Sequence, residues 1–100
     1  MIIRTLALVV ALSALAGSAL AGDEDRATAT LKSPVASPVR TMAGDVSWSC
    51  LGTVCAAYPA TESVLSVSVC KALAKAAGPV ATYSLGSKAF TPDMIARCNK

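Results

Sequence analysis

The most reactive side chains in this sequence belong to four cysteines, Cys50, Cys55, Cys70 and Cys98. Cysteines can bind zinc, exchange disulfides or form structural disulfides. Zinc ligands usually come as two close pairs, whereas four, fourteen and twenty-seven residues separate successive cysteines here. A thiol–disulfide oxidoreductase would carry two cysteines separated by two residues at a helix start. The spacing therefore favours structural disulfides over metal or redox chemistry.

Three pairings of these cysteines are open, and the entropy of loop closure does not separate them. Cys50 and Cys55 are expected on one hairpin, with Cys70 on a first helix and Cys98 on a second. If both helices cover the hairpin, each can be linked to it. The favoured pairing is therefore Cys50–Cys98 with Cys55–Cys70, and a Cys50–Cys55 bridge within the hairpin is the main alternative.

Other side chains give little sign of catalysis. The chain has no histidine, so the commonest general base and the Ser–His and Cys–His nucleophile pairs are missing. Its scattered carboxylates, such as Asp45, Glu62 and Asp93, do not form a convincing acid–base pair. Trp48 is expected in the core rather than as a ligand-stacking platform. We therefore expect no enzyme activity, no cofactor and no metal site.

The N-terminus has the pattern of a secretory signal peptide. Arg4 supplies the positive charge, an apolar run extends from Leu6 to Leu15, and Ala19–Ala21 offers small residues for signal peptidase. Cleavage is predicted between Ala21 and Gly22. The apolar run is shorter than the roughly 20 residues that cross a bilayer, so no membrane segment is expected after cleavage, and the mature protein is expected to be periplasmic or secreted.

Residues 22–44 are rich in Ala, Thr, Ser and Pro and contain no aromatic residue. Such a composition buries little apolar surface, so a flexible leader is predicted here. All four aromatic residues lie after it, and residues 45–100 are expected to form the four-cysteine module. A module of this size has a thin core and often needs covalent stabilisation.

The predicted module is α+β. Alternation over 46–50 indicates a strand, 51–54 a turn and 55–58 a returning strand, which places Cys50 opposite Cys55. Residues around 69–77 repeat at helical spacing, with Ser63 or Ser66 as the cap and Gly78 at the end. Two short strands over 80–84 and 89–90 precede a last helix from Pro92 to about Asn99. The order is ββαββα, and an antiparallel sheet with two helices on one face is expected.

These residues resemble a family of short exported four-cysteine proteins of alphaproteobacteria, of the sphingomonad and caulobacter type. The resemblance covers Val46 to Asn99 and is carried by Trp48, Cys50, Gly52, Cys55, Val69, Cys70, Leu73, Gly78, Tyr83, Gly86, Cys98 and Asn99. Position 83 is more often Phe in that family. Because the family has no assigned activity, the resemblance implies export and the cysteine framework but no functional residue.

The formal net charge is +3, and Arg4 of the predicted signal peptide contributes one of these charges. So small a net charge does not indicate binding to nucleic acid. Lys71, Lys75 and Lys88 are interpreted as solvated surface rather than as a basic face for anionic lipid or cell-wall polymer. The expected function is a non-enzymatic structural or binding role. One alternative is an envelope protein-binding or inhibitor factor that uses the turn residues Leu51, Thr53 and Leu85. The second is a thiol redox or metal-handling protein.

Overall fold

The computed structural model describes residues 24–100, so the predicted signal peptide and its cleavage point between Ala21 and Gly22 lie outside the described residues. The elements, in chain order, are the strands β1 (Ala27–Leu31), β2 (Val39–Ala43), β3 (Val46–Leu51) and β4 (Val54–Ala57), the 3₁₀ helix η2 (Glu62–Val64), the helix α2 (Val67–Ala77), the strands β5 (Val80–Leu85) and β6 (Lys88–Ala89), and the helix α3 (Pro92–Cys98).

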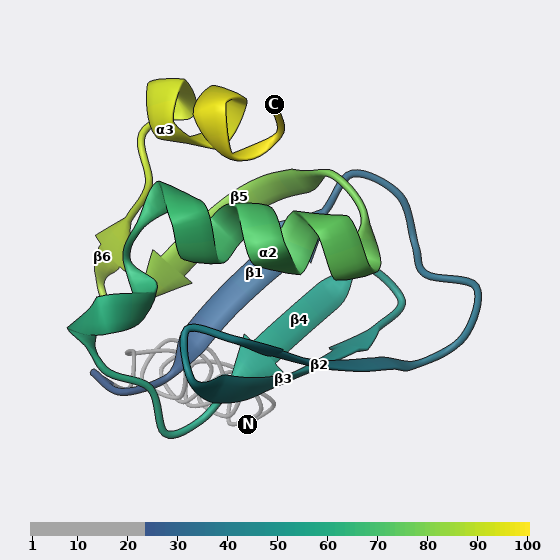
Figure 1. Cartoon of the computed structure of the whole chain (residues 1–100), viewed down its shortest axis with the longest axis horizontal. Helices are drawn as coiled ribbons and strands as arrows, with labels where there is room; N and C mark the ends of the chain where they lie inside the picture. Colours follow the sequence, from purple (N-terminus) through teal and green to yellow (C-terminus); the bar gives the residue numbers. More distant parts are fainter. Residues whose placement is uncertain (1–23) are drawn as a thin grey trace, which may run out of the picture.

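The strands form one six-stranded sheet in the order β2-β3-β4-β1-β5-β6. Every neighbouring pair is antiparallel. Helix α2 lies across one face of the sheet, and α3 lies on the same side, next to α2 and beyond β5 (Figure 1). The expected α+β class, antiparallel sheet and helices on one face are confirmed, with two strands added before the predicted ββαββα order.

The prediction of a flexible leader over 22–44 is wrong for the two segments that form β1 and β2. Strand β1 lies inside the sheet, paired with β4 on one side and β5 on the other, and β2 forms an edge beside β3. In β1, Ala27, Ala29 and Leu31 point into the core while two threonines point outward. The alternation expected of a strand is present in β1. Alanine and threonine differ little in hydrophobicity, however, so the alternation is weak and the composition suggested a linker.

The predicted boundary at Asp45 falls inside a tight hairpin. Gly44 and Asp45 join β2 to β3, with Ala43 directly opposite Val46. Both loop residues have positive φ, 67° for Gly44 and 60° for Asp45. A type I′ turn needs positive φ at both central positions, which glycine and aspartate tolerate best. This segment therefore connects two paired strands and does not separate a leader from a domain.

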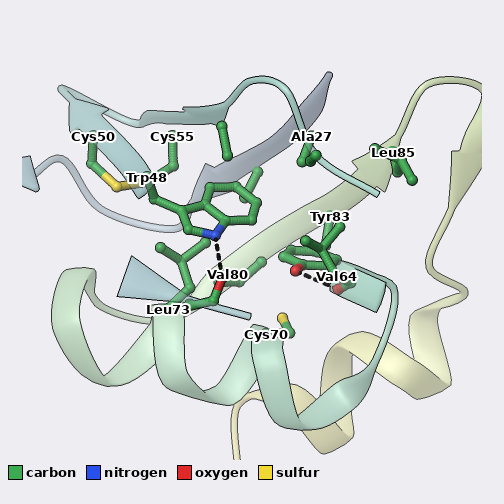
Figure 2. Packing of buried hydrophobic residues seen from close by; sticks show 14 of the residues in the cluster. Ala27, Trp48, Cys50, Cys55, Val64, Cys70, Leu73, Val80, Tyr83 and Leu85 are labelled. Atoms are coloured by element: carbon green, nitrogen blue, oxygen red, sulfur yellow. Dashed lines mark hydrogen bonds between the residues drawn. A yellow bond between two sulfur atoms is a disulfide. The ribbon is translucent and has the colours of Figure 1, made fainter. Parts of the chain in front are cut away.

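The centre of the core is an aromatic pair drawn from distant strands. The rings of Trp48 on β3 and Tyr83 on β5 stack with centroids 5.6 Å apart, although β4 and β1 lie between their strands. Strands are spaced about 4.8 Å apart, so the rings meet above the intervening strands. Ala29 on β1 and Ala57 on β4 are buried on the intervening strands, and their small side chains leave room for the two rings. Figure 2 shows Trp48 and Tyr83 in the core.

The helix boundaries follow local capping rules. Ser66, one of the two predicted caps, accepts a hydrogen bond from the Val69 backbone N–H at the start of α2. Gly78 ends α2 with a φ of 115°, as predicted for a glycine at this position. Thr91 caps α3, and Pro92 occupies its first turn. The two helices thus begin and end where the sequence signals are strongest.

Candidate functional site

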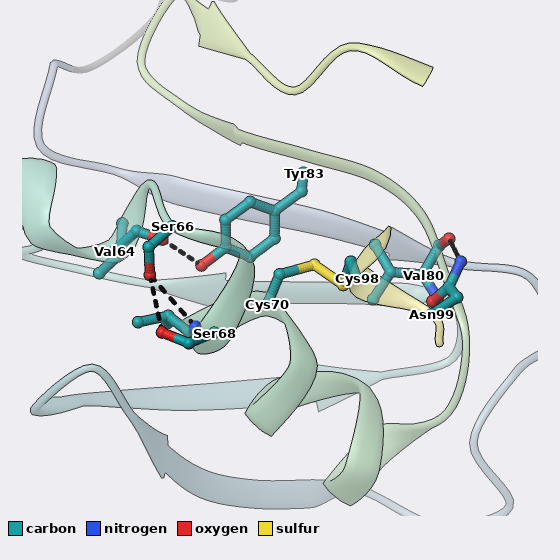
Figure 3. The surroundings of a disulfide bond; sticks show 9 residues. Val64, Ser66, Ser68, Cys70, Val80, Tyr83, Cys98 and Asn99 are labelled. Atoms are coloured by element: carbon teal, nitrogen blue, oxygen red, sulfur yellow. Dashed lines mark hydrogen bonds between the residues drawn. A yellow bond between two sulfur atoms is a disulfide. The ribbon is translucent and has the colours of Figure 1, made fainter. Parts of the chain in front are cut away.

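The four cysteines form two disulfides, Cys50–Cys55 and Cys70–Cys98 (Figures 2 and 3). The favoured pairing of Cys50 with Cys98 and Cys55 with Cys70 is therefore wrong, and the hairpin bridge held as the alternative is the one observed. Cys50 and Cys55 lie directly opposite each other, with Cα atoms 4.0 Å apart. Cys70 and Cys98 have Cα atoms 5.5 Å apart, within the usual range for a disulfide.

The incorrect pairing follows from the strand that composition concealed. Because β1 lies between β4 and β5, it separates the Cys55 hairpin from β5, the strand on which α3 packs. Cys98 therefore comes next to Cys70 of the neighbouring helix and not next to the hairpin. The two disulfides make different links, one within a hairpin and one between two helices.

All four cysteines belong to the core, and each is at most 2% exposed. The sulfur atoms are consumed in bonds, with no free cysteine among residues 24–100. Thiolate chemistry requires a solvent-accessible sulfur with a stabilised negative charge. In this arrangement the cysteines stabilise the fold, and any binding chemistry must come from the exposed surface.

Two polar side chains link elements next to the Cys70–Cys98 bridge (Figure 3). Asn99 accepts a hydrogen bond from the Val80 N–H and donates one to the Val80 C=O, both at 2.8 Å. The Tyr83 hydroxyl donates to the Val64 carbonyl at 2.7 Å. Burial raises the pKa of Tyr83 well above its ordinary value of 10.0. These contacts hold the chain after α3, and the segment before α2, against β5.

Glu62, Asp93 and Asp45, the carboxylates considered for acid–base chemistry, lie on different elements of the structure. Glu62 forms an ion pair with Lys88 across the exposed surface, and this partner lowers the pKa of Glu62 and raises that of Lys88. Asp93 pairs with Arg97 one helical turn later on α3, at 2.9 Å. Asp45 sits in the β2–β3 turn.

A groove runs between α2 and the end of the described chain. Its volume is about 540 Å³. The side chains that line it include three lysines, and the full set is Ser68, Lys71, Ala72, Ala74, Lys75, Pro79, Cys98, Asn99 and Lys100. The helical spacing predicts Lys71 and Lys75 on one exposed face of the helix, interpreted from the sequence as solvated surface and not as part of a groove. Lys100 carries no local signal, because only the packing of α3 against α2 brings it there.

The opposite face of the sheet is not covered by a helix. Leu51 and Val54 lie side by side there at the tip of the β3–β4 hairpin, and they are 70% and 49% exposed. Of the turn residues proposed for protein binding, Leu51 and Thr53 are exposed, but Leu85 is only 4% exposed and belongs to the core. The placement of Leu85 at the surface is wrong, since it pairs with Ala27 on the inner face of the sheet.

Residues 24–100 contain neither a cluster of metal ligands nor a membrane-spanning helix. No three side chains of the kinds His, Cys, Asp and Glu gather there in a way that could hold a metal ion. Among the same residues, no helix combines the length and apolar character needed to cross a bilayer.

Comparison with known proteins places the chain in a family. No curated protein and no solved structure matches it. The model of a family of unknown function, DUF8200, matches residues 7–100. The matched residues include β1 and β2 as well as the four-cysteine region. This match is longer than the segment over which the cysteine pattern was recognised. The chain belongs to the DUF8200 family.

Proposed function

We propose that this protein is a small exported module, stabilised by two disulfides, with a non-enzymatic structural or binding role in the periplasm or outside the cell. The observation that carries the proposal is a pair of buried disulfides, one within the β3–β4 hairpin and one between α2 and α3. Such bonds form and persist in oxidising compartments. The N-terminal charge, apolar run and small residues of a signal peptide support the same location.

Export is tested by expressing the full chain in its host and separating the cell fractions. We expect the protein in the periplasm or medium, with all thiols oxidised. The matched variant Leu8→Arg places a charge in the apolar run and should retain the protein in the cytoplasm with reduced thiols. Recovery of the unaltered chain from the cytoplasm would contradict the proposal.

A protein-binding or inhibitor role is the second candidate, supported by the exposed Leu51 and Val54 on the uncovered face of the sheet. Exposed apolar pairs at a hairpin tip are common contact residues in interfaces. The test is chemical crosslinking in periplasmic extract with the double variant Leu51→Ser/Val54→Ser as the comparison. Met42→Ser is the matched control, because Met42 is 65% exposed but lies on the edge strand β2. A stoichiometric partner lost only in the double variant supports this role, and recovery unchanged by it counts against it.

The third candidate is a thiol redox or metal-handling role. It requires reduction of two disulfides whose sulfur atoms lie in the core. Counting free thiols under denaturing, non-reducing conditions separates the two cases. A count of zero in the exported protein is incompatible with a four-cysteine zinc site.

A further inference from the structure

Positive charge gathers in the groove between α2 and the end of the described chain. Lys71 and Lys75 lie one helical turn apart on α2, and Lys100 lines the same groove after α3. No carboxylate side chain is among the lining residues. We propose that this groove binds a small ligand that carries two or three phosphate or carboxylate groups. The inference deepens, and rests on, the binding role proposed above.

The walls of the groove are fixed before any ligand arrives. Cys98 lies in the lining, and its disulfide to Cys70 joins α3 to α2. The next residue, Asn99, is held by two hydrogen bonds to the Val80 backbone. Lys100 therefore follows directly on an anchored residue, Asn99, whose contacts with Val80 are drawn in Figure 3. A site whose backbone is already ordered loses less entropy when a ligand binds.

The three lysines are not neutralised within the described chain. Glu62 is engaged by Lys88, and Asp93 is engaged by Arg97. Across residues 24–100, no ion pair involves the lysines of the groove. Like charges at i and i+4 on a helix repel each other, so the pair Lys71 and Lys75 slightly destabilises α2. An anion between them and Lys100 would remove that repulsion.

The dimensions and lining of the groove indicate a small ligand. Its volume of about 540 Å³ falls within the range of roughly 300–1,000 Å³ that is typical of small-molecule sites. Ala72, Ala74 and Pro79 supply an apolar surface beside the charges. The lysine ammonium groups act as point charges and bind phosphate well. Stabilisation of helix ends is a simpler role for Lys75, in the last turn of α2, but it does not account for Lys71.

The test is isothermal titration calorimetry of the exported protein, oxidised and purified from its host, with sodium tripolyphosphate and with citrate at low ionic strength. Lys71→Gln, Lys75→Gln and Lys100→Gln are compared singly and together. Each single change is expected to weaken binding about two- to fivefold, and the triple change more than tenfold. Arg40→Gln is the matched control, because it removes one positive charge from the edge strand β2, outside the groove.

Lysine-dependent binding of either probe supports the proposal, and the tighter probe assigns the anionic group. An equal loss with Arg40→Gln would show a general charge effect and would overturn it. Vesicles that contain anionic lipid are titrated in the same way. Binding of neither small probe, or binding to the vesicles alone, would also overturn the proposal. None of these outcomes affects the export test, because that test measures location and thiol oxidation and does not involve the groove.

Discussion

At the scale of single residues, Gly44 and Gly52 offer a matched pair. Both have positive φ, 67° and 62°. A Cβ added at Gly44 would meet the Val69 methyl groups at 3.0 Å, whereas a Cβ at Gly52 would have no atom within 4 Å. Their backbone requirement is the same, but their surroundings differ.

We predict that Gly52→Ala destabilises the fold by about 1 kcal/mol, the cost of placing a Cβ in the left-handed region. Gly44→Ala is expected to cost about 2–4 kcal/mol, because crowding against Val69 adds to that strain. Urea unfolding of the single variants measures both losses. A double-mutant cycle with Val69→Ala should show coupling for Gly44→Ala only. Equal losses at the two glycines would contradict this account.

Tyr83 should make stability depend on alkaline pH. Burial raises the pKa of its phenol above the ordinary value of 10.0, so the folded state holds the proton more tightly than the unfolded state. This contribution is fully present below about pH 10 and is lost as the pH rises toward the folded-state value. The expected slope reaches up to about 1.4 kcal/mol per pH unit.

The measurement is urea unfolding from about pH 9 to about pH 11. Tyr83→Phe should be less stable at neutral pH, because the Val64 carbonyl loses its donor, and its stability should fall less steeply with pH. Lys88, whose pKa Glu62 raises, contributes in the same direction, and the comparison of the two proteins removes that contribution. Parallel pH profiles for the two proteins would refute the role of the buried phenol.

At the scale of elements, the two disulfides should contribute unequally. Cys70 and Cys98 are 28 residues apart in sequence, and Cys50 and Cys55 are 5 apart. The loop-entropy relation gives about 3.5 kcal/mol for the helix–helix bridge and about 2 kcal/mol for the hairpin bridge. Thermal unfolding of Cys70→Ala/Cys98→Ala and of Cys50→Ala/Cys55→Ala should show the larger loss for the first variant. A larger loss for the hairpin variant would contradict the loop argument.

The elements also show what the sequence could and could not predict. The β3–β4 hairpin, α2, β5 and α3 were predicted because their apolar residues are large or their caps are distinctive, as at Ser66, Gly78 and Thr91. Strand β1 was missed because its inner face carries Ala27 and Ala29. The small side chain of Ala29 leaves room for the Trp48–Tyr83 pair, a requirement that no local pattern reveals.

The failure to predict β1 also explains the incorrect disulfide pairing. With β1 inserted between β4 and β5, the Cys55 hairpin and the Cys98 helix are separated, which changes the pairing. The participation of four cysteines could be inferred from their number and context. Their connectivity depended on strand order, which the sequence did not reveal. Lys100 entered the groove for a similar reason, through the packing of α3.

At the scale of the whole molecule, the described chain is one sheet with helices on one side and a largely open face on the other (Figure 1). The DUF8200 match extends over β1 and β2 as well as the four cysteines, in agreement with a fold that begins well before Asp45. Both disulfides lie in the single core. The stability of this core is therefore expected to depend on oxidation of both cysteine pairs.

The intact mass of the protein recovered from the periplasm or medium, without reduction, tests that account most directly. Two disulfides remove four hydrogens in total. We predict the mass of residues 22–100 less four hydrogens, which reports cleavage between Ala21 and Gly22 and both bridges at once. A mass that retains the residues from Met1 onward, or one that corresponds to four free thiols, would contradict the account.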